Sequence, residues 1–211
     1  KLRWQLLVVL LALAVIAVLL VSQQSNTASP GGAPQIQPAS GGVYTEALIG
    51  AFGRLNPLLD HYNSADQDID RLLFSGLIKF DARGLPMPDL AESWGVSQDG
   101  TIYNFSLRTN AVWHDGKPVT VSDVIFTLDM IKSDSSFFPA DVREMWKLVQ
   151  IKQLNDTTLQ FILPESFAPF LDYLTFGIVP RHLLETTPPD QIAASAFNLA
   201  PIGSGPYRFE R

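Results

Sequence analysis

The sequence of 211 residues contains no cysteine and few charged residues. Without thiols the chain cannot form disulfides, thiolate zinc sites or a cysteine nucleophile, and it offers no cysteine for N-terminal lipid attachment. Charged residues make up 17% of the sequence, and from Glu46 onward 13 basic residues face 21 acidic ones. Because phosphate contacts need clustered lysine and arginine, this acidic chain is not expected to bind nucleic acid.

Apolar residues are plentiful, at 46% of the sequence, and the first long group of them lies near the N-terminus. An unbroken apolar run of 16 residues extends from Leu6 to Val21, behind the basic residues Lys1 and Arg3. As a helix it would span roughly 24 Å, slightly short for a bilayer core but longer than a typical signal-peptide core. Residues 1–22 are therefore interpreted as either a cleaved signal sequence or an uncleaved membrane anchor helix. Either alternative would place the residues that follow outside the cytoplasm, because the positive flank stays inside.

The two ends of the chain that remains after the apolar run show a linker and an incomplete pattern. Residues 23–42 are rich in Ser, Gln, Pro and Gly without apolar periodicity, which is typical of a flexible linker. At the other end, Tyr207 and Phe209 alternate as in a strand, yet no further residues follow to pair with it. The first residue is also not methionine. We therefore expect the sequence to be a fragment of a longer protein.

The central part of the chain alternates between strand-like and helix-like patterns. Strands are expected over residues 43–49 and 103–107, and a hairpin over 149–151 and 159–163. A helix is expected within residues 66–80, where apolar residues recur at helical spacing, and another begins at Thr120. Because strands and helices are interspersed, the sequence predicts a mixed α/β fold.

Patterns that could carry catalysis or metal binding fail on their spacing. Asp66, Asp68 and Asp70 begin like a calcium loop, but the glycine and glutamate that such a loop requires are replaced by Arg71 and Leu77. This acidic group is therefore interpreted as the start of a helix. The three histidines form no metal-ligand pair, and no nucleophile–base set is recognisable. The residues alone predict no cofactor, no metal and no enzyme, and favour a binding module.

Several motifs, taken together in their order, resemble one protein family. The stretches concerned are Gly76–Asp81, Met87–Trp94 (MPDLAESW), Asp99–Arg108 (DGTIYNFSLR), Val112–Val124 (VWHDGKPVTVSDV), and Asn198 followed by Pro201–Tyr207 (PIGSGPY). They are similar to motifs of the extracytoplasmic solute-binding proteins of family 5, which serve ABC importers of the peptide/nickel type. The resemblance covers roughly residues 41–211. Ser75, Val121 and Ser204 depart from the family pattern, which usually has Glu, Ala and Thr there.

The resemblance implies the class II fold of periplasmic binding proteins, in which two lobes close around a solute. Domain I, part of the first lobe, would comprise residues 41–76 and 177–211. Domain II, an inserted subdomain, would comprise residues 77–176. The second lobe would be absent from this chain.

The resemblance further implies that the chain binds oligopeptides or dipeptides and delivers them to an ABC permease, and through it to the permease's ATPase. The N-terminal helix would attach it to the membrane on the extracytoplasmic side. Ligand backbone pairing is expected at the end of the first strand, with Glu46 as the nearest carboxylate, and further cleft contacts at the end of the first helix. The expected site residues are Glu46, Ala47, Leu48, Ile49, Gly50, Phe74, Ser75 and Gly76.

Other functions remain open at this point. The same fold could hold a nickel chelate, a sugar oligomer or haem, or it could serve as a membrane-anchored sensor. An envelope hydrolase is a further alternative, although the chain offers no persuasive catalytic set. The family motifs themselves are expected to be structural, with turns and helix caps in place of ligand contacts.

Overall fold

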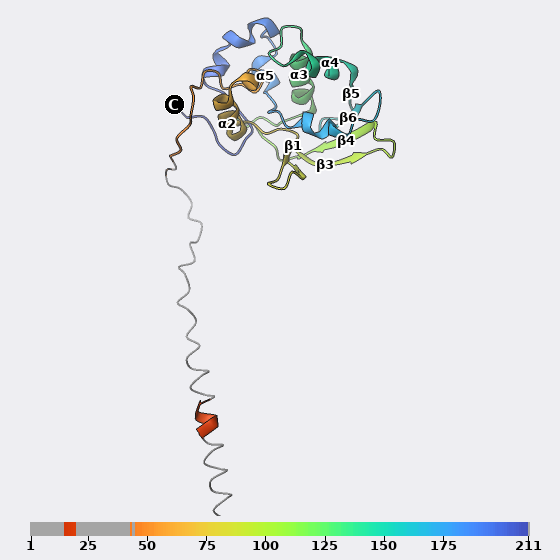
Figure 1. Cartoon of the computed structure of the whole chain (residues 1–211). Coiled ribbons are helices and arrows are strands. Elements are labelled where there is room, and N and C mark those ends of the chain that lie inside the picture. Colours follow the sequence, from red (N-terminus) through yellow and green to blue (C-terminus); the bar gives the residue numbers. More distant parts are fainter. Residues whose placement is uncertain (1–14, 20–42, 44, 211) are drawn as a thin grey trace, which may run out of the picture. The chain divides into compact units, whose positions relative to one another are not determined.

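The computed structural model describes residues 15–19, 43 and 45–210, which fall into two units, Lys1–Glu46 and Ala47–Arg211, considered separately here (Figure 1). In the first unit, residues 15–19 are helical. The rest of the apolar run and the expected linker at 23–42 lie outside the described residues. Within the part of the chain that is described, no helix has the length and apolar character needed to cross a membrane. Whether residues 1–22 act as signal or anchor therefore stays a prediction.

The second unit combines helices and strands throughout its length, which confirms the predicted mixed α/β architecture. Its elements, in chain order, are η1 (Asp60–Tyr62), α2 (Ser64–Leu73), β1 (Ile78–Phe80), β2 (Pro86–Pro88), β3 (Ala91–Val96), β4 (Ile102–Leu107), α3 (Val121–Lys132), α4 (Ala140–Leu148), β5 (Gln150–Gln153), β6 (Thr158–Ile162), η2 (Ala168–Leu174), α5 (Arg181–Leu184), η3 (Pro189–Ala194) and η4 (Ala196–Leu199).

The largest sheet is antiparallel and has four strands in the order β3-β4-β6-β5. In β4 and β6 alternate side chains are buried, and the register places Tyr103 opposite Phe161 and Phe105 opposite Leu159. This alternation follows from the period of two along a strand, which directs every second side chain to the same face. The strand and the hairpin that the sequence predicts in this region are confirmed.

Helices α3 and α4 lie over one face of this sheet, as Figure 1 shows. Trp146 of α4 is fully buried, with its ring centroid 5.8 Å from that of Phe161 on β6 and 5.7 Å from that of Phe170 on η2. The main core of the molecule therefore sits between the sheet, the two helices and η2.

Helix α3 begins where the sequence predicts, with Thr120 as its N-cap residue. One carboxylate oxygen of Asp123 accepts from the Thr120 backbone N–H at 2.8 Å and from its hydroxyl at 3.0 Å. The other oxygen accepts from the backbone N–H of Arg181, at the start of α5, at 2.9 Å. One buried carboxylate thus closes the helix start and joins two segments 58 residues apart.

The loop Gly203–Gly205 docks against the end of α2. The Gly205 N–H donates to the Leu73 carbonyl at 2.8 Å, and a side chain on Gly203 would collide with that same carbonyl oxygen. The ring of His114 holds the loop from the other side, because its Nδ1 accepts from the Gly203 N–H at 3.2 Å while its Nε2 lies 3.0 Å from the Gly205 carbonyl oxygen. The prediction that the motif around Gly203 has a structural role is consistent with these contacts.

Two sequence predictions about secondary structure are wrong, and a third is confirmed only in part. Residues 45–49 form no strand, and a strand needs a pairing partner, which these residues lack within the described chain. Tyr207 and Phe209 likewise belong to no strand. The helix expected within residues 66–80 spans Ser64–Leu73 instead, because Phe74 is already extended and a Cβ on Gly76 would lie 2.8 Å from the Thr175 carbonyl oxygen. The buried Leu77 belongs to the approach to β1.

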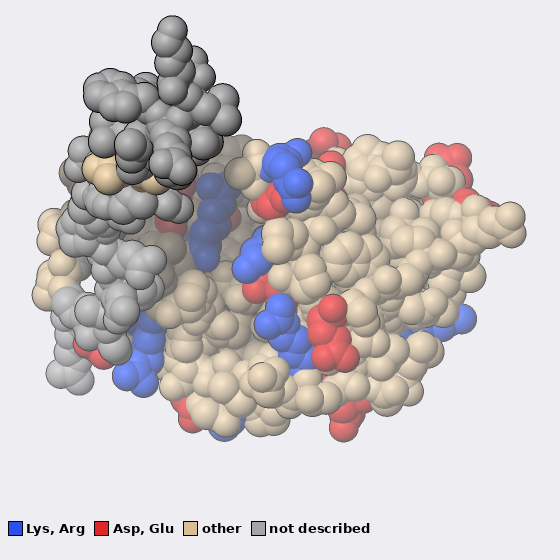
Figure 2. Space-filling view, turned by 90° about the horizontal axis from the view of Figure 1, so that it is seen from below, with Lys and Arg blue, Asp and Glu red and all other residues tan. Residues whose placement is uncertain are grey.

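Charged side chains are scattered over the surface seen in Figure 2, with wide uncharged areas between them and no continuous basic stripe on the visible face.

Candidate ligand-binding site

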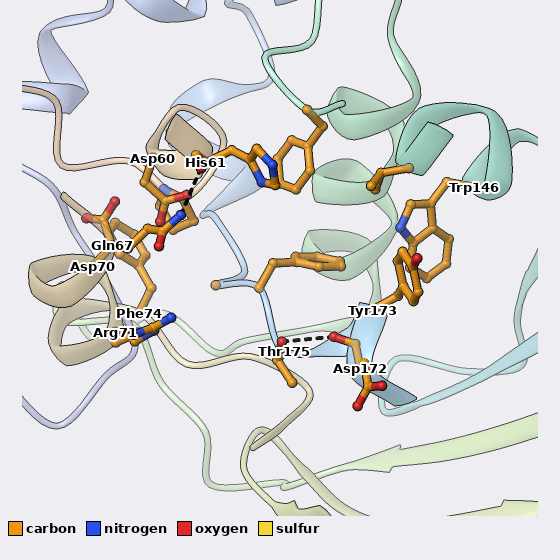
Figure 3. A pocket seen from close by; sticks show the side chains of 15 residues that line it. Asp60, His61, Gln67, Asp70, Arg71, Phe74, Trp146, Asp172, Tyr173 and Thr175 are labelled. Carbon is orange, nitrogen blue, oxygen red and sulfur yellow. Dashed lines mark hydrogen bonds between the residues drawn. The ribbon is translucent and has the colours of Figure 1, made fainter. Parts of the chain in front are cut away.

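A cavity of about 300 Å³ lies between the segment of η1 and α2 on one side and α4, η2 and the chain after η2 on the other (Figure 3). This volume is at the lower end of the range for small-molecule sites. Its lining residues are Pro57, Asp60, His61, Gln67, Asp70, Arg71, Phe74, Phe138, Val142, Trp146, Asp172, Tyr173, Thr175, Phe176 and Gly177.

One end of the cavity is aromatic. Figure 3 shows Trp146 and Tyr173 at this end, on the opposite side from Asp60 and Asp70. The rings are fixed by mutual contacts: Phe176 packs edge-on against Trp146 at a centroid distance of 6.1 Å, and against Phe138 at 6.4 Å. Rigid aromatic walls of this kind offer apolar area to a ligand at low entropic cost.

The other end is acidic and is formed by η1 and the inward face of α2. Figure 3 shows Asp60, Gln67 and Asp70 together there. Asp70 follows Asp66 by four residues, so both lie on one face of α2. Asp66 is well satisfied, since its carboxylate accepts from the Gly53 N–H at 2.8 Å and from the Asn63 side-chain amide at 2.9 Å. Asp70 is only 2% exposed, and neither of its carboxylate oxygens has a hydrogen-bond partner in the described structure.

Burial and mutual repulsion raise the pKa values of the two carboxyl groups at this end. Burial, followed by the charges of Asp60 and Asp66, raises the pKa of Asp70 to about 8, although the Asn56 backbone opposes the shift. Burial also raises the pKa of Asp60 to about 7, and the nearby Arg71 charge opposes that shift. Near neutral pH the two groups therefore hold protons that ordinary surface carboxyls would have lost.

The raised pKa of Asp70 predicts that the protein loses stability as the pH rises from about 4 to about 8. In this window the folded state keeps a proton that the unfolded state has released, so the free energy of unfolding falls with increasing pH. Asp70→Asn should remove the Asp70 part of this dependence, leaving that of Asp60, and be more stable than the wild type by roughly 1–2 kcal/mol at pH 8, with little difference at pH 5. Urea unfolding at both pH values measures the effect.

Asp129→Asn, an exposed change on α3, is the matched control and should follow the wild type. Parallel pH profiles for all three proteins would contradict the assignment.

The site residues predicted at the end of the first helix lie next to this cavity or behind it. Phe74 lines the cavity and is also buried in a small core with Leu55 and Leu73. Ser75 and Gly76 do not line it: the Ser75 carbonyl accepts from the Ile178 N–H at 3.0 Å, and the Gly76 carbonyl accepts from the Leu90 N–H at 3.0 Å.

The other predicted site residues, Glu46 to Gly50, are exposed and do not line the cavity. Ala47, Leu48 and Ile49 have no regular secondary structure, and Gly50 adopts a positive φ of 126°. A Cβ on Gly50 would lie 3.3 Å from the Ala65 side chain, so this segment passes close to α2. Their role in ligand binding stays a prediction.

Sequence reasoning missed most of the cavity. Asp60, Trp146 and Tyr173 come from three separate segments, and no local pattern connects them. The sequence predicts Asp66 and Asp70 at the start of a helix, where α2 places them, but gives no sign that they lie near a cavity. Among the described residues no group of three acidic or histidine side chains is placed to hold a metal ion. The periodicity of α2, with Asp66 and Asp70 on the face that also carries Leu73, was the available signal.

Comparison with known proteins identifies relatives across this region. The model of the bacterial extracellular solute-binding proteins, family 5 (middle part), matches residues 86–211. The oligopeptide-binding protein AppA of Bacillus subtilis is 30% identical over 216 aligned residues, covering 100% of this chain and 39% of AppA. The chain spans between 23% and 39% of the length of the curated relatives considered.

Solved structures share the fold. The structure of Bacillus subtilis AppA in complex with a nonapeptide has a TM-score of 0.70 at 27% identity, covering 78% of this chain and 33% of AppA. NikZ from Campylobacter jejuni, in complex with Ni(L-His), has a TM-score of 0.64 at 34% identity, covering 77% of this chain and 31% of NikZ.

Proposed function

Because the chain belongs to the bacterial extracellular solute-binding proteins of family 5, we propose that it is part of the solute-binding component of an ABC importer and that its solute is a peptide. The observation that carries the choice of peptide is the similarity to oligopeptide-binding AppA over the full length of this chain. The family consists of solute-binding proteins, so the expected role is binding and release without chemical change.

The cavity between α2 and α4 supports this role. It joins a rigid aromatic wall to an acidic end, a combination that accepts a ligand with both apolar and polar parts. We place part of the peptide in this cavity. Ala47, Leu48 and Ile49 belong to no strand, so their backbone groups remain candidates for pairing with the backbone of an extended peptide, as in β-augmentation.

The two-lobe arrangement and the partners follow from the same proposal. Residues 41–76 and 177–211 would form domain I, residues 77–176 domain II, and a second lobe would close over the solute by hinge motion. The protein would work outside the cytoplasm, attached to the membrane through the N-terminal apolar segment, and deliver its solute to a permease coupled to an ATPase.

A metal chelate is the second candidate solute. The similarity to NikZ, at 34% identity, favours it. The described residues offer no cluster of metal ligands of their own. A metal ion in this cavity would therefore need organic ligands that enter with it, as in a chelate.

Native mass spectrometry of the full-length protein, purified without added solute, tests the proposal. A set of co-purified peptides, displaced by an excess of a synthetic peptide, is the expected result. A bound nickel chelate would favour the second candidate. A protein that carries no peptide and gains none from a mixture of peptides of two to nine residues would overturn the peptide assignment.

A further inference from the structure

The acidic end of the cavity lacks a counter-ion. Neither Asp60 nor Asp70 takes part in an ion pair in the described structure. Arg71, whose charge acts on Asp60, pairs instead with Asp68 at 3.4 Å, and its side chain is 73% exposed. Asp60 therefore lines the cavity without an ion-pair partner, and the covered oxygens of Asp70 have none either.

The other charged and titratable groups around this end do not supply the missing charge. Asp66 adds a further negative charge on α2, and its oxygens are already used by the Gly53 and Asn63 donors. His61 of η1 and Asp172 of η2 also line the cavity. Among the lining residues, carboxyl groups thus outnumber the single arginine, so a solute cation would meet carboxyls that become charged once their protons are displaced.

We propose that the acidic end of this cavity binds a cationic group of the solute, an ammonium or a guanidinium, with Asp60 in direct contact and Asp70 acting from behind it. The assignment rests on the proposed function, because it names the class of solute for that same site. Asp60 is the contact residue because it is half-buried and lines the cavity, whereas the oxygens of Asp70 are covered.

The physical basis is the cost of burying a carboxyl without a partner. Such a group either keeps its proton or needs a cation and hydrogen-bond donors. An ammonium or guanidinium group supplies both, through charge-assisted hydrogen bonds, which are stronger than neutral ones. The apolar part of the same solute packs against the aromatic end, where the half-buried rings of Tyr173 and Phe176 line the cavity.

The proposal carries a pH signature. Because Asp60 and Asp70 titrate near pH 7 and 8, a cation must displace protons from them on binding. A guanidinium keeps its charge throughout this range, so its affinity should rise between pH 6 and pH 8.5. A neutral solute of the same shape should show no such rise.

Two matched tripeptides test the assignment on the full-length protein by isothermal titration calorimetry. Ala-Arg-Ala carries a guanidinium, and Ala-citrulline-Ala replaces it with a neutral urea group of nearly the same shape. The wild type should bind the arginine peptide at least about tenfold more tightly at pH 8, a difference typical of one charge-assisted contact. Asp60→Asn should reduce the preference to less than about threefold, and Asp70→Asn should reduce it in part.

Asp129→Asn is the control, because it removes one exposed acidic charge from α3, outside the cavity lining, and should keep the full preference. The affinity for the citrulline peptide should stay nearly constant in every variant, which shows that each variant is folded. If a variant does not fold, the arginine preference and its pH slope in the wild type decide the question alone.

Equal binding of both peptides by the wild type would overturn the cation assignment but leave peptide binding intact. Binding of neither tripeptide by a protein that retains other peptides would overturn the cation assignment alone, whereas a protein that retains no peptide at all would overturn the proposed function and the assignment with it.

Discussion

Gly203→Ala is expected to destabilise the fold by about 3 kcal/mol or more. The added Cβ would collide with the carbonyl oxygen of Leu73 and would lie 3.3 Å from Cε1 of His114. The first obstacle is backbone at the end of α2, and it cannot retreat easily because the same oxygen accepts the Gly205 N–H at 2.8 Å. Relief would require the loop to leave α2, with loss of the two His114 contacts as well.

Chemical unfolding of the variant, followed by circular dichroism, measures this loss. Gly95→Ala is the matched control, because a Cβ on Gly95 of β3 would meet no heavy atom within 4 Å. The control should change the free energy of unfolding by less than about 1 kcal/mol. Similar losses in both variants would mean that the contact between the loop and α2 is not the cause.

Asp123→Ala is expected to cost about 2–4 kcal/mol, since three donors lose their acceptor at once. The buried carboxylate accepts from the Thr120 N–H, the Thr120 hydroxyl and the Arg181 N–H. Its loss removes half of the capping box at the start of α3 and leaves the Arg181 N–H without its partner, so α5 should also loosen. Urea unfolding gives the stability, and hydrogen exchange at the Arg181 amide should report the local effect.

Asp129→Ala on the same helix separates this effect from a general loss of helix charge. Its side chain is 60% exposed and pairs only with Lys132, at 2.8 Å. Exposed ion pairs of this spacing contribute little, so the control should lie within about 0.5 kcal/mol of the wild type. An Asp123→Ala variant as stable as this control would contradict the role assigned to the carboxylate.

The sequence predicts the parts of the fold that have local signals. Strand β4 and the hairpin of β5 and β6 follow from alternating burial, and α3 follows from Thr120 and Asp123 at its start. The predicted strand at residues 43–49 fails because strand formation depends on a partner, which local pattern does not reveal. The helix within residues 66–80 ends early, at Leu73, and the chain after it is extended from Phe74 and passes close to the Thr175 backbone at Gly76, a contact between distant segments.

The candidate site could be predicted only in part. Phe74 lines the cavity as expected for a cleft residue, but the cavity as a whole depends on segments around residues 60, 146 and 173 that only tertiary packing brings together. The acidic group on α2 was visible in the sequence, yet its burial and lack of partners were not. A buried carboxyl without a partner is a property of the packed structure. The proposal that the solute carries a cationic group depends on this property.

The central claim is that this chain holds a solute without altering it. Native mass spectrometry tests the claim most directly when the masses of the bound peptide and of the released peptide are compared after hours of incubation with the full-length protein. The account predicts a peptide that stays bound and is released at its original mass. Fragments of that peptide, or a protein that never retains one, would contradict it.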